Sequence, residues 1–228
     1  MLLIQEYLEI KQNLLLKNKL FQYLEWGVYQ LEDFSRLAYS ISFWVMSFQD
    51  LLRINLSQIN DKQYYQIVRQ HLMEDVGHDN WFLYDLKAMN LEQPSLQILY
   101  SKPHTAVRDA TFSLMSEVFR ATYDYERIVL VLTLESAGHI FFESVADFVE
   151  KHNYTNRLKY FSHHHLSVEK SHEIFEKQIQ SYLNNIQLSH DEELQVLNMI
   201  DRVYKAFELM FDGLAIALST TTRFEVAN

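Results

Sequence analysis

The sequence predicts an all-α protein, a single-domain bundle of seven helices that covers residues 1–228. Only four glycines and two prolines occur in the 228 residues, too few for the many tight turns of an all-β protein. Hydrophobic residues make up 48% of the chain, which excludes disorder and is enough for a sizeable core. Long stretches, such as residues 31–52, repeat their apolar residues at helical spacing.

The first half of the chain contains four predicted helices. The first covers about residues 2–23 and ends near Gly27, and the second covers about residues 31–58. Asn60–Asp61 is typical of the cap that begins a helix, and it predicts a third helix over about residues 62–89. Pro103 fits the first turn of a fourth helix, over about residues 103–123.

Three more helices are predicted in the second half. The fifth is the segment "YDYERIVLVLTLESAGHIFFESVADFVEKH", which the following "NYTN" ends. The sixth covers about residues 156–185, and the seventh begins at Ser189 or Asp191 and runs to about residue 218. Since the chain shows no internal repeat, linker or low-complexity stretch, one domain is expected.

The charge and the cysteine content exclude several classes of protein. A formal net charge of -10 argues against nucleic acid or an anionic membrane as a partner. The absence of cysteine excludes disulfides, thiolate chemistry and cysteine-based zinc sites. The first residues carry charges throughout and resemble no signal peptide, and the longest apolar run, "IVLVLTL" (128–134), is far short of a membrane span. We therefore expect a soluble, cytoplasmic protein.

The segment "FSHHHLSVEKSHEIF" (161–175) raises the question of a metal site. On a helix at about 100° per residue, His165, Glu169 and His172 share one stripe, whereas His163 and His164 point away from it. Imidazole and carboxylate ligands suit iron, manganese and zinc. A solvated polar face explains this segment equally well when it is considered alone.

Two other predicted helices carry matching side chains. His71 and His78 are seven residues apart on the third, with Glu74 between them. On the fifth, Glu135 directly follows the apolar run and His139 comes one turn later. A carboxylate in apolar surroundings is costly to bury unless it is paired or binds a metal. Seven of the ten histidines lie in these three stretches, a concentration that favours a metal site shared by three helices.

The order and spacing of these residues resemble the haem-oxygenase-like diiron oxidases and oxygenases. That family has Glu-x6-His on one helix, a Glu on a later helix and His-x3-Asp-x2-His on a third. His78 matches the histidine of the first motif and Glu135 the lone carboxylate, while His165, Glu169 and His172 occupy the third motif. The resemblance implies a haem-oxygenase-like fold, two irons and O₂ as co-substrate.

Two positions depart from the family's motifs. His71 stands where the family has Glu, which removes a possible bridging oxygen that Glu74 could replace. Glu169 stands where the family has Asp, which keeps the charge with a longer reach. The resemblance gives Glu135 as an expected catalytic residue. His139, one turn on and within about 40° of the same stripe, is the second candidate, and a histidine hydrogen-bonded within the core explains it at least as well. The expected metal ligands are His71, His78, Glu135, His165, Glu169 and His172.

The resemblance also implies a class of reaction. Several members oxidise free amino acids or their derivatives at or near the amine, and a nitrile synthase that acts on a tryptophan-type amino acid in natural-product biosynthesis is among them. The arginines that could hold a substrate carboxylate are Arg36, Arg108, Arg120 and Arg127. A non-redox mononuclear metal enzyme and a metal-free regulatory protein on the same fold remain open. So does a homodimer, which is frequent in the family.

Overall fold

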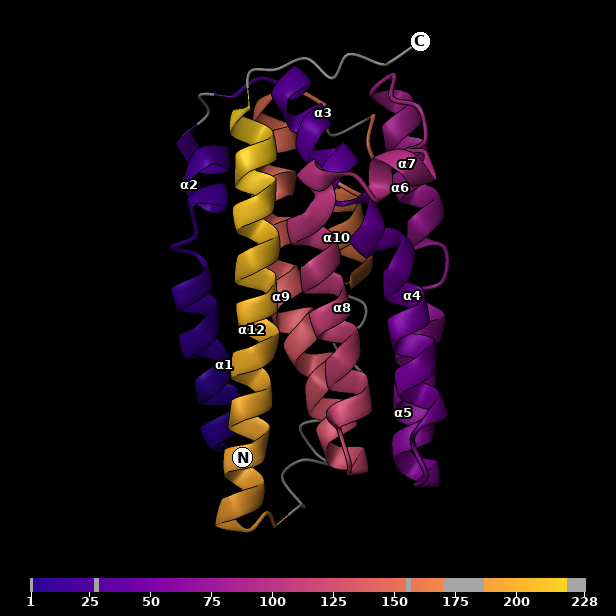
Figure 1. Cartoon of the computed structure of the whole chain (residues 1–228), viewed down its shortest axis with the longest axis vertical. Helices are drawn as coiled ribbons and strands as arrows, with labels where there is room; N and C mark the ends of the chain where they lie inside the picture. Colours follow the sequence, from indigo (N-terminus) through magenta and orange to yellow (C-terminus); the bar gives the residue numbers. More distant parts are fainter. Residues whose placement is uncertain (1, 27–28, 155–156, 170–186, 221–228) are drawn as a thin grey trace.

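The structure, a computed structural model, describes residues 2–26, 29–154, 157–169 and 187–220. In these ranges it contains helices and turns but no β-strand, which confirms the all-α class. The longer helices run roughly along the long axis of the molecule (Figure 1). The seven predicted helices are subdivided, because three of them are each broken once.

The first break separates α1 (Leu2–Leu15) from α2 (Lys19–Trp26). The side chain of Asn18 accepts a hydrogen bond from the backbone N–H of Leu20 at 2.9 Å, and so it caps the start of α2. The second break, at Ile41, separates α3 (Leu31–Ser40) from α4 (Ser42–Ser57). Both breaks lie inside stretches whose apolar periodicity continues, so the periodicity alone did not locate them.

The third break lies between α5 (Lys62–Glu74) and α6 (His78–Ala88). Asp61 begins α5 by accepting from the N–H groups of Gln63 and Tyr64, as its predicted cap position requires. Gly77 has φ +98°, a left-handed conformation that glycine adopts without the steric cost of a Cβ atom. This turn lies between His71 and His78, which were predicted to lie on one helix.

The remaining elements follow the prediction more closely. After α7 (Leu96–Leu99) and a short 3₁₀ helix (Lys102–His104), the long helices are α8 (Thr105–Arg120), α9 (Asp124–Lys151) and α12 (His190–Ser219). Ser189 caps α12, as expected. The predicted sixth helix starts later, since α10 covers His163–Glu169 after a set of turns. Residues 170–186 of that prediction lie outside the described residues.

Helix α9 lies at the centre of the bundle (Figure 1). Its length and hydropathy would be sufficient for a membrane span, which the short run 128–134 had not suggested. More than half of its most apolar 18-residue window is buried against other helices, however. It contacts α12, α10, α2, α1 and α5, as the central helix of a bundle does.

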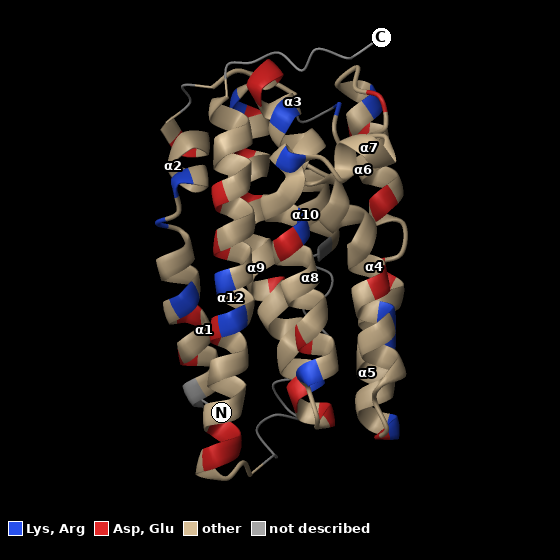
Figure 2. Cartoon of the chain, viewed as in Figure 1, with Lys and Arg blue, Asp and Glu red and all other residues tan. Residues whose placement is uncertain are grey.

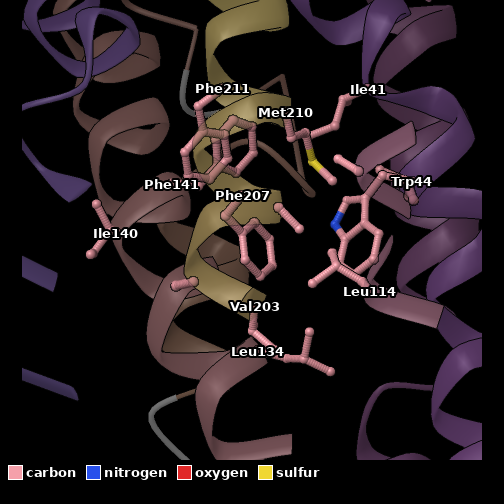
Figure 3. Packing of buried hydrophobic residues seen from close by; sticks show 14 of the residues in the cluster. Ile41, Trp44, Leu114, Leu134, Ile140, Phe141, Val203, Phe207, Met210 and Phe211 are labelled. Carbon is pink, nitrogen blue, oxygen red and sulfur yellow. The ribbon is translucent and has the colours of Figure 1, made fainter. Parts of the chain in front are cut away.

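Aromatic and aliphatic side chains from α4, α8, α9 and α12 fill the core (Figure 3). Phe141 and Phe211 stack with their ring centroids 5.6 Å apart. Trp44 meets Phe207 edge to face at the same centroid distance, 5.6 Å. Leu134, the residue before Glu135, belongs to this core cluster. The hydrophobic core therefore borders the position of Glu135, the predicted carboxylate ligand.

Charged side chains of both signs occur along the same helices on the face seen in Figure 2. The first turn of α12 is acidic, with Asp191, Glu192 and Glu193. Acidic and basic side chains both occur along α1 and along the middle of α12 (Figure 2). The basic side chains on this face are therefore interspersed with acidic ones rather than gathered in one stripe.

Candidate metal centre

The turn between α5 and α6 brings three potential ligands to one place. His71 lies in the last turn of α5, Asp75 ends that helix, and His78 is the first residue of α6. All three are buried, with exposures of 1%, 4% and 8%. Gln49 on α4 donates a 2.7 Å hydrogen bond to the carbonyl of Asp75 and holds the turn in place.

Helices α9 and α10 complete the group. The Nε2 atom of His71 lies 3.1 Å from Oε1 of Glu135 and 3.2 Å from Oδ2 of Asp75. The other oxygen of Asp75, Oδ1, lies 3.1 Å from Nδ1 of His78. That nitrogen is in turn 3.3 Å from Nε2 of His165. We call these five residues the buried centre: His71, Asp75, His78, Glu135 and His165.

The hydrogen bond of His165 to the backbone fixes which of its nitrogens can bind a metal. Nδ1 lies 3.1 Å from the carbonyl oxygen of Tyr160. A carbonyl only accepts, so Nδ1 carries the hydrogen and Nε2 keeps its lone pair in the neutral ring. That lone pair faces His78 and the rest of the buried centre. This backbone partner is typical of metal-binding histidines.

The buried centre favours a positive charge. Burial alone would lower the pKa of His71, but the carboxylates of Glu135, Asp75 and Glu74 outweigh it and raise that pKa to about 9. An imidazolium at this position neutralises part of the surrounding negative charge. A divalent metal ion would do the same more completely, and its binding would release the proton.

The spacing of the donor atoms also fits a metal. With ligand bonds of about 2.1 Å, neighbouring donors are about 3.0 Å apart around an octahedral ion and about 3.4 Å apart around a tetrahedral one. The four separations in the buried centre are 3.1, 3.2, 3.1 and 3.3 Å. Three nitrogens and two carboxylates also form a donor set that suits iron, manganese or zinc. The residues present therefore fit the metal that the sequence predicts.

A cavity of about 50 Å³ adjoins the buried centre. Its apolar lining includes Trp44, Phe48, Phe142 and Phe207, and the first and last of these are seen in Figure 3. Gly138 on α9 also faces it, and a Cβ atom there would meet only Phe142, at an ordinary 4.0 Å. The cavity has room for a few water molecules next to the ligand atoms.

Four of the predicted site residues come together, namely His71, His78, Glu135 and His165. The side chain of Glu135 remains 27% exposed, so its surroundings are wetter than the apolar run before it predicted. His139 is exposed and does not line the cavity, although it follows Glu135 by one turn. The prediction that His139 lies on the same helix face as Glu135, toward the site, is therefore wrong.

Two predicted ligands lie where the structure describes no side chain. Glu169 ends α10, but its side chain is outside the described residues, and so is the whole of His172. Glu74, the alternative to His71, accepts a hydrogen bond from Gln70 at 3.0 Å through Oε1, while its Oε2 is buried without a hydrogen-bond partner. Of these two neighbours on α5, the structure brings His71 to the site.

Asp75 was not among the predicted ligands. The signal was present, because His71, Asp75 and His78 have the spacing His-x3-Asp-x2-His. This is the spacing that the resembled family shows on its third ligand helix. The chain therefore carries the spacing twice, counting the predicted ligands that begin at His165.

None of the four predicted arginine partners lines the cavity. Arg127 is buried and donates to the carbonyls of Val118 and Ala121 at 2.8 and 2.6 Å. Arg108 donates to backbone carbonyls before α8, and Arg36 does so at the end of α12. Arg120 pairs with a glutamate on its own helix. These arginines stabilise the fold at the places described.

A second group of potential ligands lies on the surface. His163 at the start of α10 has its Nε2 3.3 Å from a carboxylate oxygen of Asp147 and 3.3 Å from one of Glu150, both on α9. The three side chains are 39%, 56% and 65% exposed in that order. We call them the surface trio.

Comparisons with known proteins give no family for this chain. It matches no protein-family model and no curated protein. What the buried centre does must therefore be inferred from its own geometry and chemistry.

Proposed function

We propose that this protein is a non-haem diiron enzyme that uses O₂ to oxidise a small substrate derived from an amino acid. The single observation that carries the proposal is the position of Asp75. Its two carboxylate oxygens face two different histidines, Oδ2 toward His71 and Oδ1 toward His78. A carboxylate placed in this way is suited to bridge two metal ions.

Each half of the buried centre has further donors. Beyond His71 lies Glu135, and beyond His78 lies His165. His71, Glu135 and one oxygen of Asp75 would hold the first iron. His78, His165 and the other oxygen of Asp75 would hold the second iron. When bound, the two irons would supply electrons for the reduction of O₂.

The surrounding residues support this chemistry by their placement. Gln49 fixes the backbone of Asp75, and the Tyr160 carbonyl fixes the ring of His165. The aromatic wall that includes Trp44 and Phe207 limits the access of water to the ligand atoms. These residues orient the ligands and keep one side of the cavity apolar.

The class of substrate rests on the resemblance and on one further residue. Asp79, one position after His78, lines the cavity and can accept hydrogen bonds from the ammonium group of an amino acid. The aromatic lining is of the kind that contacts an aromatic side chain, but a cavity of about 50 Å³ must widen to admit one. The candidate reaction is the conversion of a tryptophan-type amino acid to a nitrile, the reaction of the nitrile synthase among the members of the resembled family.

A mononuclear, non-redox metal enzyme is the second candidate. His71, Asp75 and Glu135 by themselves form a compact group, with ligand atoms all within 4.8 Å of one another. Three protein ligands leave coordination positions for water and substrate, as catalytic zinc sites do. In that case His78 and His165 would orient Asp75 without binding a metal.

Iron loading separates the two candidates. The protein is loaded with Fe(II) without oxygen, desalted, and analysed for iron per chain. About two irons per chain support the diiron proposal and about one favours the mononuclear enzyme. No retained iron would contradict the diiron proposal.

A further inference from the structure

Asp85 on α6 is a carboxylate in the protein interior that takes no direct part in the buried centre. It is 0% exposed. Its Oδ1 accepts the backbone N–H of Lys159 at 2.7 Å, and its Oδ2 accepts that of Phe161 at 3.0 Å. Asp85 thus holds the turns that lead into α10, the helix of His165.

The hydrogen bond to Phe161 reaches one particular peptide group. The N–H of Phe161 and the C=O of Tyr160 belong to the same peptide, which is planar and trans, so the two groups point in opposite directions. Asp85 accepts from the N–H side. His165 donates from its Nδ1 to the C=O side, at 3.1 Å. A single rigid plane therefore links the carboxylate of Asp85 to the ring of His165.

Polarisation adds to this mechanical link. A carboxylate that accepts from the N–H of a peptide makes its carbonyl oxygen a stronger acceptor, because hydrogen bonds in a chain reinforce one another. The ring of Tyr160 also lies against His165, with centroids 4.9 Å apart and an interplanar angle of 25°. Both contacts restrain the imidazole in one orientation, with Nε2 toward His78.

We propose that Asp85 is a positioning residue for the metal centre, acting through the Tyr160–Phe161 peptide to fix the tautomer and direction of His165. This inference rests on the proposed function, since it assumes that His165 binds a metal. Burial raises the pKa of Asp85 to about 6, so its ionised form at neutral pH costs stability. A neutral side chain would avoid that cost but would accept the two N–H groups less well.

The test compares Asp85→Asn with a matched control, Glu117→Gln. Asparagine keeps the shape but can accept only one of the two backbone N–H groups through its single oxygen. Glu117 is likewise buried, at 3% exposure, and pairs with Arg202, outside the buried centre. Both substitutions replace a buried carboxylate by an amide, but only Asp85 is connected to His165 through hydrogen bonds.

Cobalt(II) titration, followed by its visible absorption, gives the number and affinity of the metal ions without any turnover. In Asp85→Asn we expect one of two equivalents to bind up to about 10-fold more weakly, the lower end of the effect of removing a ligand's direct partner, because Asp85 acts through the Tyr160–Phe161 peptide. Glu117→Gln should bind both equivalents as the wild type does. Equal weakening in both variants would overturn the inference, because the effect would then be global.

Nitrogen-15 NMR of the imidazole in the metal-free wild-type protein provides a second readout that needs no variant. We expect the neutral ring of His165 to carry its hydrogen on Nδ1. A hydrogen on Nε2 would overturn the inference, even if Asp85→Asn failed to fold.

The two proposals can fail separately. A wild-type protein that binds no cobalt would contradict the metal centre itself. Wild-type binding of two equivalents that Asp85→Asn retained at full affinity would leave the metal centre in place and overturn only the role of Asp85.

Discussion

The buried centre and the surface trio contain the same kinds of side chain at similar distances. Histidine and carboxylate donors are 3.1–3.3 Å apart in the first and 3.3 Å apart in the second. Their surroundings differ. His71 and Asp75 have side-chain exposures of 1% and 6%, whereas those of the surface trio are 39–65%.

This difference decides what each group can do. In the surface trio, water solvates the charges whether or not they meet, and such pairs contribute about 0–1 kcal/mol. In the buried centre, carboxylates without a cation would be costly, so the fold requires a proton or a metal there. Helices α9 and α10 contribute to both groups. Burial therefore distinguishes the candidate site from an ordinary ion pair better than residue type does.

Substitution of Glu135 should give the largest contrast between the two groups. Glutamine keeps the size but removes the charge that the proposed first iron needs. We expect Glu135→Gln to lower O₂ consumption by the iron-loaded protein at least about 100-fold, since it removes a ligand rather than the partner of one. Asp147→Asn in the surface trio is the control and should consume O₂ at the wild-type rate. An oxygen electrode measures both, and normal consumption by the Glu135 variant would contradict the proposed centre.

His71 and Glu74 lie on the same helix, α5, but only His71 belongs to the buried centre. His71→Ala should lose about one of the two irons per chain, because its nitrogen contacts Glu135 and Asp75 in one half of the centre only. Glu74→Ala should keep both irons, because its carboxylate accepts from Gln70 instead. Iron analysis after anaerobic loading checks this pair. The reverse result would make Glu74 the ligand.

The stability of the metal-free protein should depend on pH through Asp85. Its folded-state pKa of about 6 lies above the ordinary 3.8, so the folded state binds the proton more tightly than the unfolded state. The contribution of Asp85 to the free energy of unfolding is then complete below about pH 4 and is lost as the pH rises through 6. A shift of this size corresponds to roughly 3 kcal/mol.

Urea unfolding at several pH values between 4 and 7, for the wild type and for Asp85→Asn, measures this dependence. The stability advantage of the wild type over the variant should shrink as the pH rises. An advantage that stays constant from pH 4 to 7 would show that the carboxyl group of Asp85 titrates alike in both states.

The surface trio should give the smallest effect. His163→Ala removes an exposed histidine from two exposed carboxylates. We expect the free energy of unfolding to change by no more than about 0.5 kcal/mol, and the iron content to stay the same. Urea unfolding and iron analysis check both. A loss of iron would mean that the trio contributes to metal binding despite its exposure.

Composition and periodicity were enough to predict the helical class and most of the long helices. The caps at Asp61 and Ser189 gave the starts of α5 and α12 because their side chains accept local backbone N–H groups. The breaks at Asn18, Ile41 and Gly77 were missed, since the apolar pattern continues across them. Helical periodicity indicates which face of a helix is buried. It cannot locate a break when the residues on both sides of the break bury the same face.

The prediction of the site residues was limited in the same way as the prediction of the helices. His71, His78, Glu135 and His165 were found because their types and spacing suit a metal. Asp75 was missed, although its carboxylate lies between His71 and His78 in the folded structure and contacts both. His139 was placed wrongly, because a position about 40° from Glu135 on the helical wheel was enough to turn it into solvent. Spacing along a helix gives a direction, whereas the neighbouring helices decide whether that direction is buried.

In the proposed centre, Asp75 would hold two irons close enough to couple. Parallel-mode electron paramagnetic resonance of the protein, loaded without oxygen with two equivalents of Fe(II), tests this coupling. We predict the integer-spin signal of a coupled pair in the wild type and in Asp147→Asn, and its loss in Asp75→Asn. Two uncoupled irons in the wild type, or a coupled signal that survives in Asp75→Asn, would contradict the claim.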